Sequence, residues 1–146
     1  MELTEKANKK RLPIREGLLT TPLSPLSEVQ LLGGRCKGCQ EISLGKGQYC
    51  PNCGAEEKQD LPLSKRGKLW TYTIIRHRPP GDYKGPDPFS PYGLGLVELP
   101  EGIRVLSPLD AETSDLAIGM PLELAVFKLY EDTEGNEIIA FKFKSI

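Results

Sequence analysis

The strongest hydrophobic pattern begins near the middle of the chain. Residues 69–78 read LWTYTIIRHR, in which aromatic and β-branched side chains fill consecutive positions. Residues of these types favour a β-strand over a helix. Strand alternation predicts Trp70, Tyr72 and Ile74 on one face, with Leu69 and the intervening residues on the other.

Four later segments also have the apolar patterns of strands. They cover residues 92–99, 102–109, 121–131 and 136–145. The sequence Pro100-Glu101-Gly102 predicts a tight link between the first two. A turn containing Gly135 predicts a hairpin between the last two.

Only residues 114–119, SDLAIG, indicate a short helical turn among these strands. Ser114 is placed to cap this turn and Gly119 to end it. Five strands with one short helix between the third and the fourth form the element order of an OB-type barrel. We therefore predict a mainly β protein with a five-stranded OB-fold barrel.

The first part of the chain is organised differently. In residues 1–28, charged positions are followed by LLTTPLSPLSE, where prolines limit any helix to short pieces. We expect an arm that wraps its own domain or docks on a partner. Residues 29–36 predict a short strand, the segment ISLGKGQYC predicts a returning hairpin, and residues 54–67 predict a polar connector. The expected organisation is an arm over residues 1–28, a ribbon over 29–60 and an OB-fold domain over 61–146.

The ribbon holds the clearest chemical motif. Its four cysteines follow the pattern C-x2-C-x10-C-x2-C and are Cys36, Cys39, Cys50 and Cys53. Two such pairs, with Gly38 inside the first and Gly54 after the second, can turn onto one ion. Four thiolates close a tetrahedral shell, so we predict a structural zinc site that also helps to fold the ribbon. Iron would suit the same ligands, and two disulfides or four free thiols are the plainer alternatives.

Composition and charge limit the classes of partner and the cellular compartment that we expect for this protein. The chain has 146 residues and a formal net charge of −1, with a pI near 5.9. These values give no general attraction to nucleic acid or to an anionic membrane. The N-terminus lacks the apolar core of a signal peptide, and no segment approaches the roughly 18 apolar residues of a membrane span. Because the cysteines are clustered, we expect a soluble protein of the reducing cytoplasm.

Positive charge is concentrated between Ser64 and Pro86. This stretch holds one acid, Asp82, and six basic residues: Lys65, Arg66, Lys68, Arg76, Arg78 and Lys84. A phosphate-bearing ligand fits this stretch better than any other part of the chain. A solvated strand face rich in lysine and arginine is the alternative interpretation.

A long loop rich in proline and glycine, residues 79–93, separates the first two barrel strands. Loops of this length are often functional. We expect exposed aromatics at Tyr83, Phe89 and Tyr92 that pack on a partner or a ligand ring, or else cover the end of the barrel. His77, the single histidine, has no orienting acid nearby in sequence, so we expect it to line a binding surface without acting in catalysis.

These motifs together resemble a known family. The ribbon is followed by YGLGLVELPEG and DLAIGMPLEL. This combination is similar to the rubredoxin-like zinc-ribbon/OB-fold proteins associated with thiolases and acyl-CoA enzymes, over nearly the whole chain from about Leu31. The resemblance implies zinc bound by the four cysteines. It also implies a thiolase-fold partner subunit that carries the catalytic residues, with CoA or acyl-CoA as the ligand of the complex.

Within that family, the long loop GDYKGPDPFSPYG is most similar to the small subunits of benzoylsuccinyl-CoA thiolases of anaerobic toluene degradation. This likeness implies support for cleavage of benzoylsuccinyl-CoA, with a second CoA, to benzoyl-CoA and succinyl-CoA. The family offers no short CoA motif to carry over. Our expected phosphate contacts are therefore a physical inference: Arg76, Arg78 and Lys84, with His77 lining the same surface.

Two other functions compete with this interpretation. Zinc ribbons and OB barrels also occur in nucleic-acid-binding modules, although the acidic pI and the few aromatics disfavour one here. The chain could alternatively be a free-standing acyl-CoA carrier or regulator. Association with a thiolase-fold protein, with single-stranded nucleic acid or with CoA alone separates the three.

Overall fold

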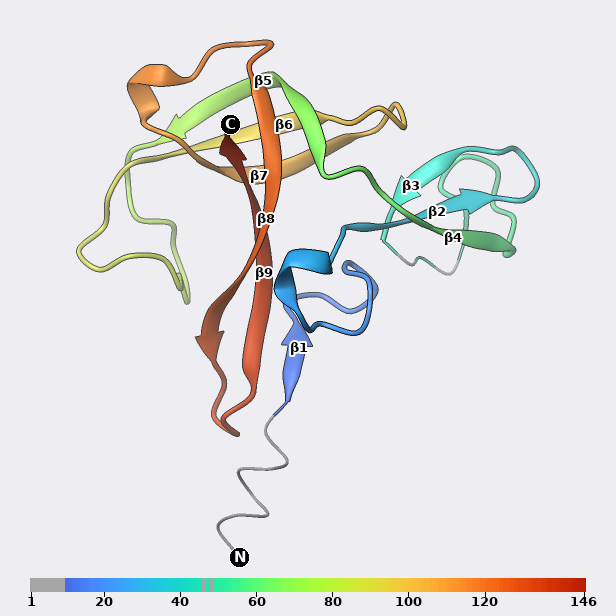
Figure 1. The fold of residues 1–146 in the computed structure, drawn as a ribbon, viewed down its shortest axis with the longest axis horizontal. Coiled ribbons are helices and arrows are strands. Elements are labelled where there is room, and N and C mark those ends of the chain that lie inside the picture. The colour runs from blue at the N-terminus through green and yellow to red at the C-terminus, as the bar shows by residue number, and fades with distance from the viewer. Residues whose placement is uncertain (1–9, 46, 48) are drawn as a thin grey trace, which may run out of the picture.

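The computed structural model describes residues 10–45, 47 and 49–146. The expectation about a signal peptide falls largely on residues outside these ranges, as do two positions of the expected ribbon hairpin. Figure 1 shows the barrel beside a smaller sheet, with the N-terminal segment close to both. The smaller sheet has three strands. No helix in the described part of the chain is long and apolar enough to cross a membrane.

Five strands form the barrel: β5 (Arg66–Ile75), β6 (Tyr92–Glu98), β7 (Arg104–Asp110), β8 (Pro121–Glu131) and β9 (Glu137–Ser145). The strand order is β9-β7-β6-β5-β8, and β8 closes the barrel by pairing with β9. A short 3-10 helix, η2 (Thr113–Asp115), lies between the third and fourth of these strands. The mainly β fold with a five-stranded barrel is confirmed.

The barrel closes around Phe143. In β9 this residue is opposite Leu109 of the parallel strand β7 and also opposite Leu124 of the antiparallel strand β8. Its side chain is 0% exposed and belongs to the continuous apolar core. Phe143 therefore lies in the core where β7, β8 and β9 meet.

The predicted faces of β5 are wrong at one end. A β-bulge shifts the register between Leu69 and Thr71. Leu69 is 1% exposed, so it shares the inner face with the half-buried Tyr72, whereas Trp70 is 44% exposed. The sequence pattern predicts instead that Trp70 lies on the face of Tyr72, with Leu69 on the opposite face. A bulge inserts one extra residue and so reverses the alternation from that point.

The helical turn also differs from its prediction. Ser114 lies inside η2, while Glu112 occupies the N-cap position and makes no side-chain capping hydrogen bond. Gly119 has a φ of 90°, and its N–H donates to the Leu69 carbonyl at 2.7 Å. Both expectations for this turn are wrong: Ser114 does not cap it, and η2 ends at Asp115 with Leu116 as its C-cap, while Gly119 lies in a separate turn closed by Met120 N–H and the Ala117 carbonyl.

The small sheet has three strands, in the order β3-β2-β4: β2 (Leu32–Cys36), β3 (Ile42–Leu44) and β4 (Lys58–Pro62). The predicted polar connector therefore contains a strand, because all of β4 pairs with β2. Its sequence KQDLP has little apolar character. Backbone pairing with β2 forms this strand without the hydrophobic face that sequence patterns detect.

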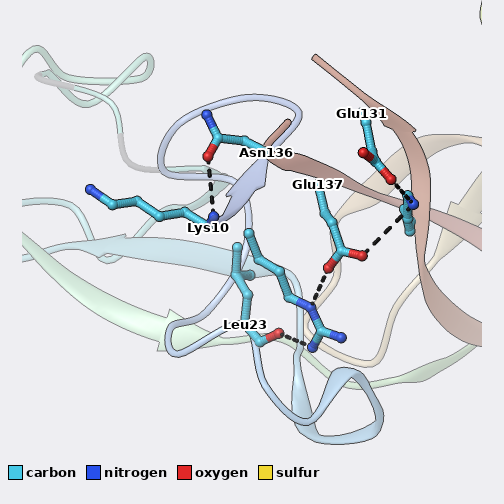
Figure 2. Close-up of polar contacts among 7 residues, drawn as sticks. Lys10, Leu23, Glu131, Asn136 and Glu137 are labelled. Atoms are coloured by element: carbon cyan, nitrogen blue, oxygen red, sulfur yellow. Dashed lines mark hydrogen bonds and ion pairs between the residues drawn. The ribbon is translucent and has the colours of Figure 1, made fainter. Parts of the chain in front are cut away.

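The N-terminal segment packs on the chain's own barrel. Strand β1 (Arg11–Pro13) runs parallel to β9, and a 3-10 helix, η1 (Leu26–Glu28), follows it. Figure 2 shows the Lys10 N–H donating to Asn136 Oδ1 at 3.1 Å and Glu137 beside the same segment. Three leucines of this segment join the core: Leu18, Leu19 and Leu23. Of the two arrangements expected for an arm, the described part adopts the one that wraps its own domain.

The turn between β8 and β9, next to the N-terminal segment, contains a carboxylate, Asp132, whose ionisation stabilises the fold. Asp132 Oδ1 accepts hydrogen bonds from Asn136 N at 2.8 Å and Glu134 N at 2.9 Å. The backbone hydrogen bond from Asn136 holds the pKa of Asp132 below its ordinary value. Because the unfolded pKa is about 3.9, ionised Asp132 stabilises the fold above about pH 4, and this contribution is lost as the pH falls through the folded value.

Asp132→Asn should therefore lower the melting temperature more at pH 7 than at pH 3. Thermal unfolding at both values measures the difference. Asp115→Asn, which neutralises an exposed carboxylate in η2, is the matched control. Equal losses for Asp132→Asn at the two pH values would contradict this assignment.

Candidate functional site

The four cysteine sulfurs meet at one end of the small sheet. All four Sγ atoms lie within 4.8 Å of one another. The Cys36–Cys53 separation is 3.5 Å and the Cys39–Cys50 separation is 3.7 Å. A disulfide requires about 2.05 Å, so these distances exclude the disulfide alternative for this conformation.

Two similar backbone turns bring the sulfurs together. The first turn is closed by hydrogen bonds from Cys36 N to Glu41 O at 2.9 Å and from Gln40 N to Cys36 O at 2.9 Å. The second is closed by Cys50 N to Ala55 O at 2.8 Å and Gly54 N to Cys50 O at 2.9 Å. The chain thus presents each C-x2-C pair with the same local geometry.

Of the two glycines expected to permit these turns, only Gly54 has the backbone conformation that favours glycine. The residue after each pair has a left-handed backbone, with φ of 68° at Gln40 and 80° at Gly54. Gly38 is not among the residues of positive φ, and a Cβ there would meet its neighbours at an ordinary 3.5 Å. The role predicted for Gly38 is therefore wrong, because Gln40 supplies the left-handed residue of the first turn.

The geometry fits a tetrahedral metal ion. Thiolates at the usual Zn–S distance of about 2.3 Å lie about 3.8 Å from one another at the corners of a tetrahedron. The observed separations of 3.5 and 3.7 Å are close to that value. Four thiolates in such an arrangement leave no ligand position for substrate, as a structural site requires.

Hydrogen bonds to sulfur favour the thiolate form at Cys36 and Cys39, whereas at Cys53 the Ala55 backbone hydrogen bond is outweighed by the neighbouring Cys36 and Cys39 sulfurs, which raise the pKa to about 11. The Cys39 N–H, followed by the Gly38 N–H, lowers the pKa of the Cys36 thiol to about 6, despite burial. The side-chain amide of Asn52 donates to Cys39 Sγ at 3.4 Å and lowers the pKa of that thiol as well. Asn52 lies between Cys50 and Cys53, and the sequence analysis missed its role. Such donors around metal thiolates are common, so its position inside the motif was the available signal.

The basic stretch identified in the sequence does not form one cluster. Arg66 lies at the start of β5 and pairs with Glu123 at 3.1 Å, whereas Arg76 and Arg78 follow the end of the strand. Ten residues of extended strand span roughly 30 Å. The two ends of the stretch are therefore too far apart to bind the same phosphate group.

The four expected CoA contacts lie in or beside the long loop. Arg76 and His77 are exposed, and no side-chain hydrogen bond or ion pair involves them among the described residues. Arg78 lies 4.0 Å from Asp87 and its guanidinium is 5.3 Å from the centre of the Tyr83 ring. Lys84 pairs with Asp82 at 3.0 Å. The carboxylates offset part of this positive charge, which the sequence count alone did not reveal.

The loop aromatics contact one another. Tyr83 and Phe89 have ring centroids 5.9 Å apart, and Tyr92 lies 6.4 Å from Tyr83 and 6.2 Å from Phe89. All three are half-buried, not exposed as expected, and burial raises the pKa of Tyr92. The Lys84 ammonium also lies 4.7 Å from the centre of the Tyr130 ring in β8. These contacts fold the loop against itself and against the barrel.

Comparison with known proteins places this architecture in a family. Residues 61–128 match the family described as ChsH2, C-terminal OB-fold domain. A DUF35 domain-containing scaffold protein of Pyrococcus furiosus is 35% identical over 120 residues, which cover 80% of this chain and 84% of the relative. The chain belongs to the ChsH2-type DUF35 family. The resemblance inferred from the sequence motifs is thereby confirmed.

Two further matches are named for the enzyme to which they belong. Benzoylsuccinyl-CoA thiolase subunit BbsA of Thauera aromatica is 31% identical over 117 residues, covering 80% of this chain and 76% of that protein. A solved structure named Ltp2-ChsH2(DUF35) aldolase aligns with a TM-score of 0.60 and 26% identity, over 80% of this chain and 84% of the other. Relatives of this chain thus include a thiolase subunit, a scaffold protein and part of an aldolase.

Proposed function

We propose that this chain is a non-catalytic accessory subunit of a thiolase-type complex that acts on acyl-CoA. The observation that carries the proposal is the cysteine cluster in a chain of this family. All four cysteines of the sequence converge on one closed metal site, which leaves no thiol as a nucleophile. The single histidine is exposed and has no side-chain partner among the described residues. The catalytic groups then belong to the partner chain.

The metal in this proposal is one zinc ion with a structural role. Cys36, Cys39, Cys50 and Cys53 would hold it, and bound zinc would join the two turns of a ribbon that has little core of its own. The sulfur separations and the hydrogen-bonded thiolates support this assignment. The protein residues fix the two turns, and Asn52 supports the charge on Cys39.

The substrate of the complex is proposed from the relatives. BbsA of Thauera aromatica is a benzoylsuccinyl-CoA thiolase subunit by name. The sequence resemblance of the loop GDYKGPDPFSPYG to such subunits supports the same substrate. We infer that the complex cleaves benzoylsuccinyl-CoA with CoA to give benzoyl-CoA and succinyl-CoA, a reaction of anaerobic toluene degradation. This chain supports the reaction without breaking a bond itself.

The CoA phosphates are proposed to bind beside the loop. Arg76 has no side-chain ion pair among the described residues. Arg78 has an ion pair with Asp87 at 4.0 Å and a contact with the Tyr83 ring, and its exposed guanidinium can still turn toward an anion. Lys84 and His77 line the same part of the barrel end in this proposal. Guanidinium groups suit phosphate because they donate two parallel hydrogen bonds.

Replacing Arg76 and Arg78 together with alanine should raise the KM for CoA of the assembled complex by about 10-fold or more, as expected for the loss of charge-assisted hydrogen bonds worth about 1.5–3 kcal/mol each. The melting temperature should stay unchanged because both side chains are exposed. Arg66→Ala, at the other end of β5, is the matched control. An unchanged KM in the double variant would refute the phosphate assignment.

Affinity purification from the native source tests the accessory-subunit function. The tagged chain should bring down a thiolase-fold protein in fixed stoichiometry, identified by mass spectrometry, with about one zinc per copy of this chain. Recovery of the chain with nucleic acid, or without a thiolase-fold protein, would contradict the proposed function and leave the metal site unaffected.

A further inference from the structure

The β-bulge in β5 places a tryptophan in solvent. Tryptophan is usually largely buried, yet Trp70 is 44% exposed. Leu69, one residue earlier, points into the barrel, and the register shift between Leu69 and Thr71 leaves Trp70 and Thr71 both exposed before the half-buried Tyr72. Bulges commonly re-aim a side chain at a functional position. The indole thus lies on the outer face of the strand, beside the bulge.

Neighbouring strands extend the apolar surface around Trp70. Thr71, next to it in β5, is opposite Leu96 of β6, and Leu96 is opposite Leu106 of β7. Leu106 is 60% exposed and Leu96 is half-buried. Figure 1 shows these three strands running side by side across the barrel. Trp70, Leu96 and Leu106 form what we call the outer patch.

Charged side chains hold and border the outer patch. The guanidinium of Arg104 lies 3.8 Å from the centre of the Trp70 ring and pairs with Glu98 at 3.2 Å. Lys68 is exposed and is opposite Glu98 in the β5–β6 register. The rim therefore has two cations, Lys68 and Arg104, against one anion, Glu98. Tryptophan and arginine are the residue types most enriched at interface hot spots.

We propose that the outer patch is the surface on which this chain docks its catalytic partner. This inference rests on the proposed accessory function. The contacting surface of the partner should have an apolar recess that accepts the Trp70 indole and an acidic rim that complements Lys68 and Arg104. The names of relatives as scaffold protein and thiolase subunit support a protein occupant.

The composition of the outer patch disfavours a nucleic acid as its occupant. Bases bind such surfaces by stacking on free aromatic faces. The chain has one tryptophan, and Arg104 already covers a face of its ring. The rest of the outer patch is aliphatic. A protein surface matches leucine side chains better than a nucleotide strand does.

The test compares Trp70→Ala with Ile14→Ala in binding to the purified thiolase-fold chain identified above. Ile14 is 46% exposed, so it matches Trp70 in exposure but lies outside the outer patch. Trp70→Ala should weaken the Kd by at least about 30-fold, which corresponds to the roughly 2 kcal/mol that defines a hot spot, while the control leaves it unchanged. Leu106→Ser should also weaken binding and carries the test if Trp70→Ala fails to fold.

The outcomes separate the two proposals. Failure of the wild-type chain to bind the thiolase-fold protein would overturn the accessory function. Binding by wild type with an unchanged Kd in both outer-patch variants would overturn the docking surface alone. A wild-type dimer that Trp70→Ala dissociates, or oligonucleotide binding that Trp70→Ala abolishes, would assign the outer patch to a different occupant and overturn this inference.

Discussion

Replacing Cys50 with serine should remove the metal and unfold the three-stranded sheet. Structural zinc contributes about 10–16 kcal/mol of binding free energy in ribbon-sized peptides at neutral pH, and a missing thiolate removes much of it. Without the metal, few other contacts stabilise the sheet, because β3 has three residues and β4 is mostly polar. Metal analysis should give far less than one zinc per chain. Hydrogen exchange should show loss of protection in β2 and β4.

The barrel should survive this substitution because its strands pair among themselves. Protection in β6 and β9 is therefore the internal reference. Ser43→Ala is the matched control within the ribbon, since its hydroxyl accepts a hydrogen bond from Lys58 at 3.2 Å and makes no hydrogen bond to a cysteine among the described residues. Full zinc content in Cys50→Ser would show that this thiol is not a ligand.

Phe143→Ala should cost about 3–5 kcal/mol in the free energy of unfolding, the usual range for a buried phenylalanine. The side chain is 0% exposed and lies where β7, β8 and β9 meet, so its removal leaves a cavity that these strands cannot close. Urea denaturation followed by circular dichroism measures the change.

Ile146→Ala is the control for this substitution. Its side chain is 64% exposed, so the expected change is within about 0.5 kcal/mol. A loss below about 1.5 kcal/mol in Phe143→Ala would mean that the barrel closes around other side chains.

The barrel was predictable because its strands carry their own apolar patterns. The predicted range 121–131 matches β8 (Pro121–Glu131), and 92–99 differs from β6 (Tyr92–Glu98) by one residue. The metal site was predictable for a different reason, since the spacing of four cysteines fixes which atoms can meet. In both cases the decisive information is local in sequence.

The features that the sequence did not reveal depend on contacts between distant segments. Strand β4 exists because β2 pairs with it, and its polar residues carry no strand signal. The bulge at Trp70 is set by register with β6, and this register decides which side of β5 faces the core. The offset of Arg78 by Asp87 likewise depends on how the loop folds. The CoA contacts and the domain boundaries at residues 28 and 60 stay predictions.

Acyl-CoA turnover by the reconstituted proteins tests the central claim most directly. This chain and its thiolase-fold partner are assayed separately and then mixed in equal amounts, with benzoylsuccinyl-CoA and CoA as substrates. We expect no turnover by this chain alone and full activity only when both are present. Turnover by this chain alone, or equal activity of the partner without it, would contradict a required, non-catalytic subunit.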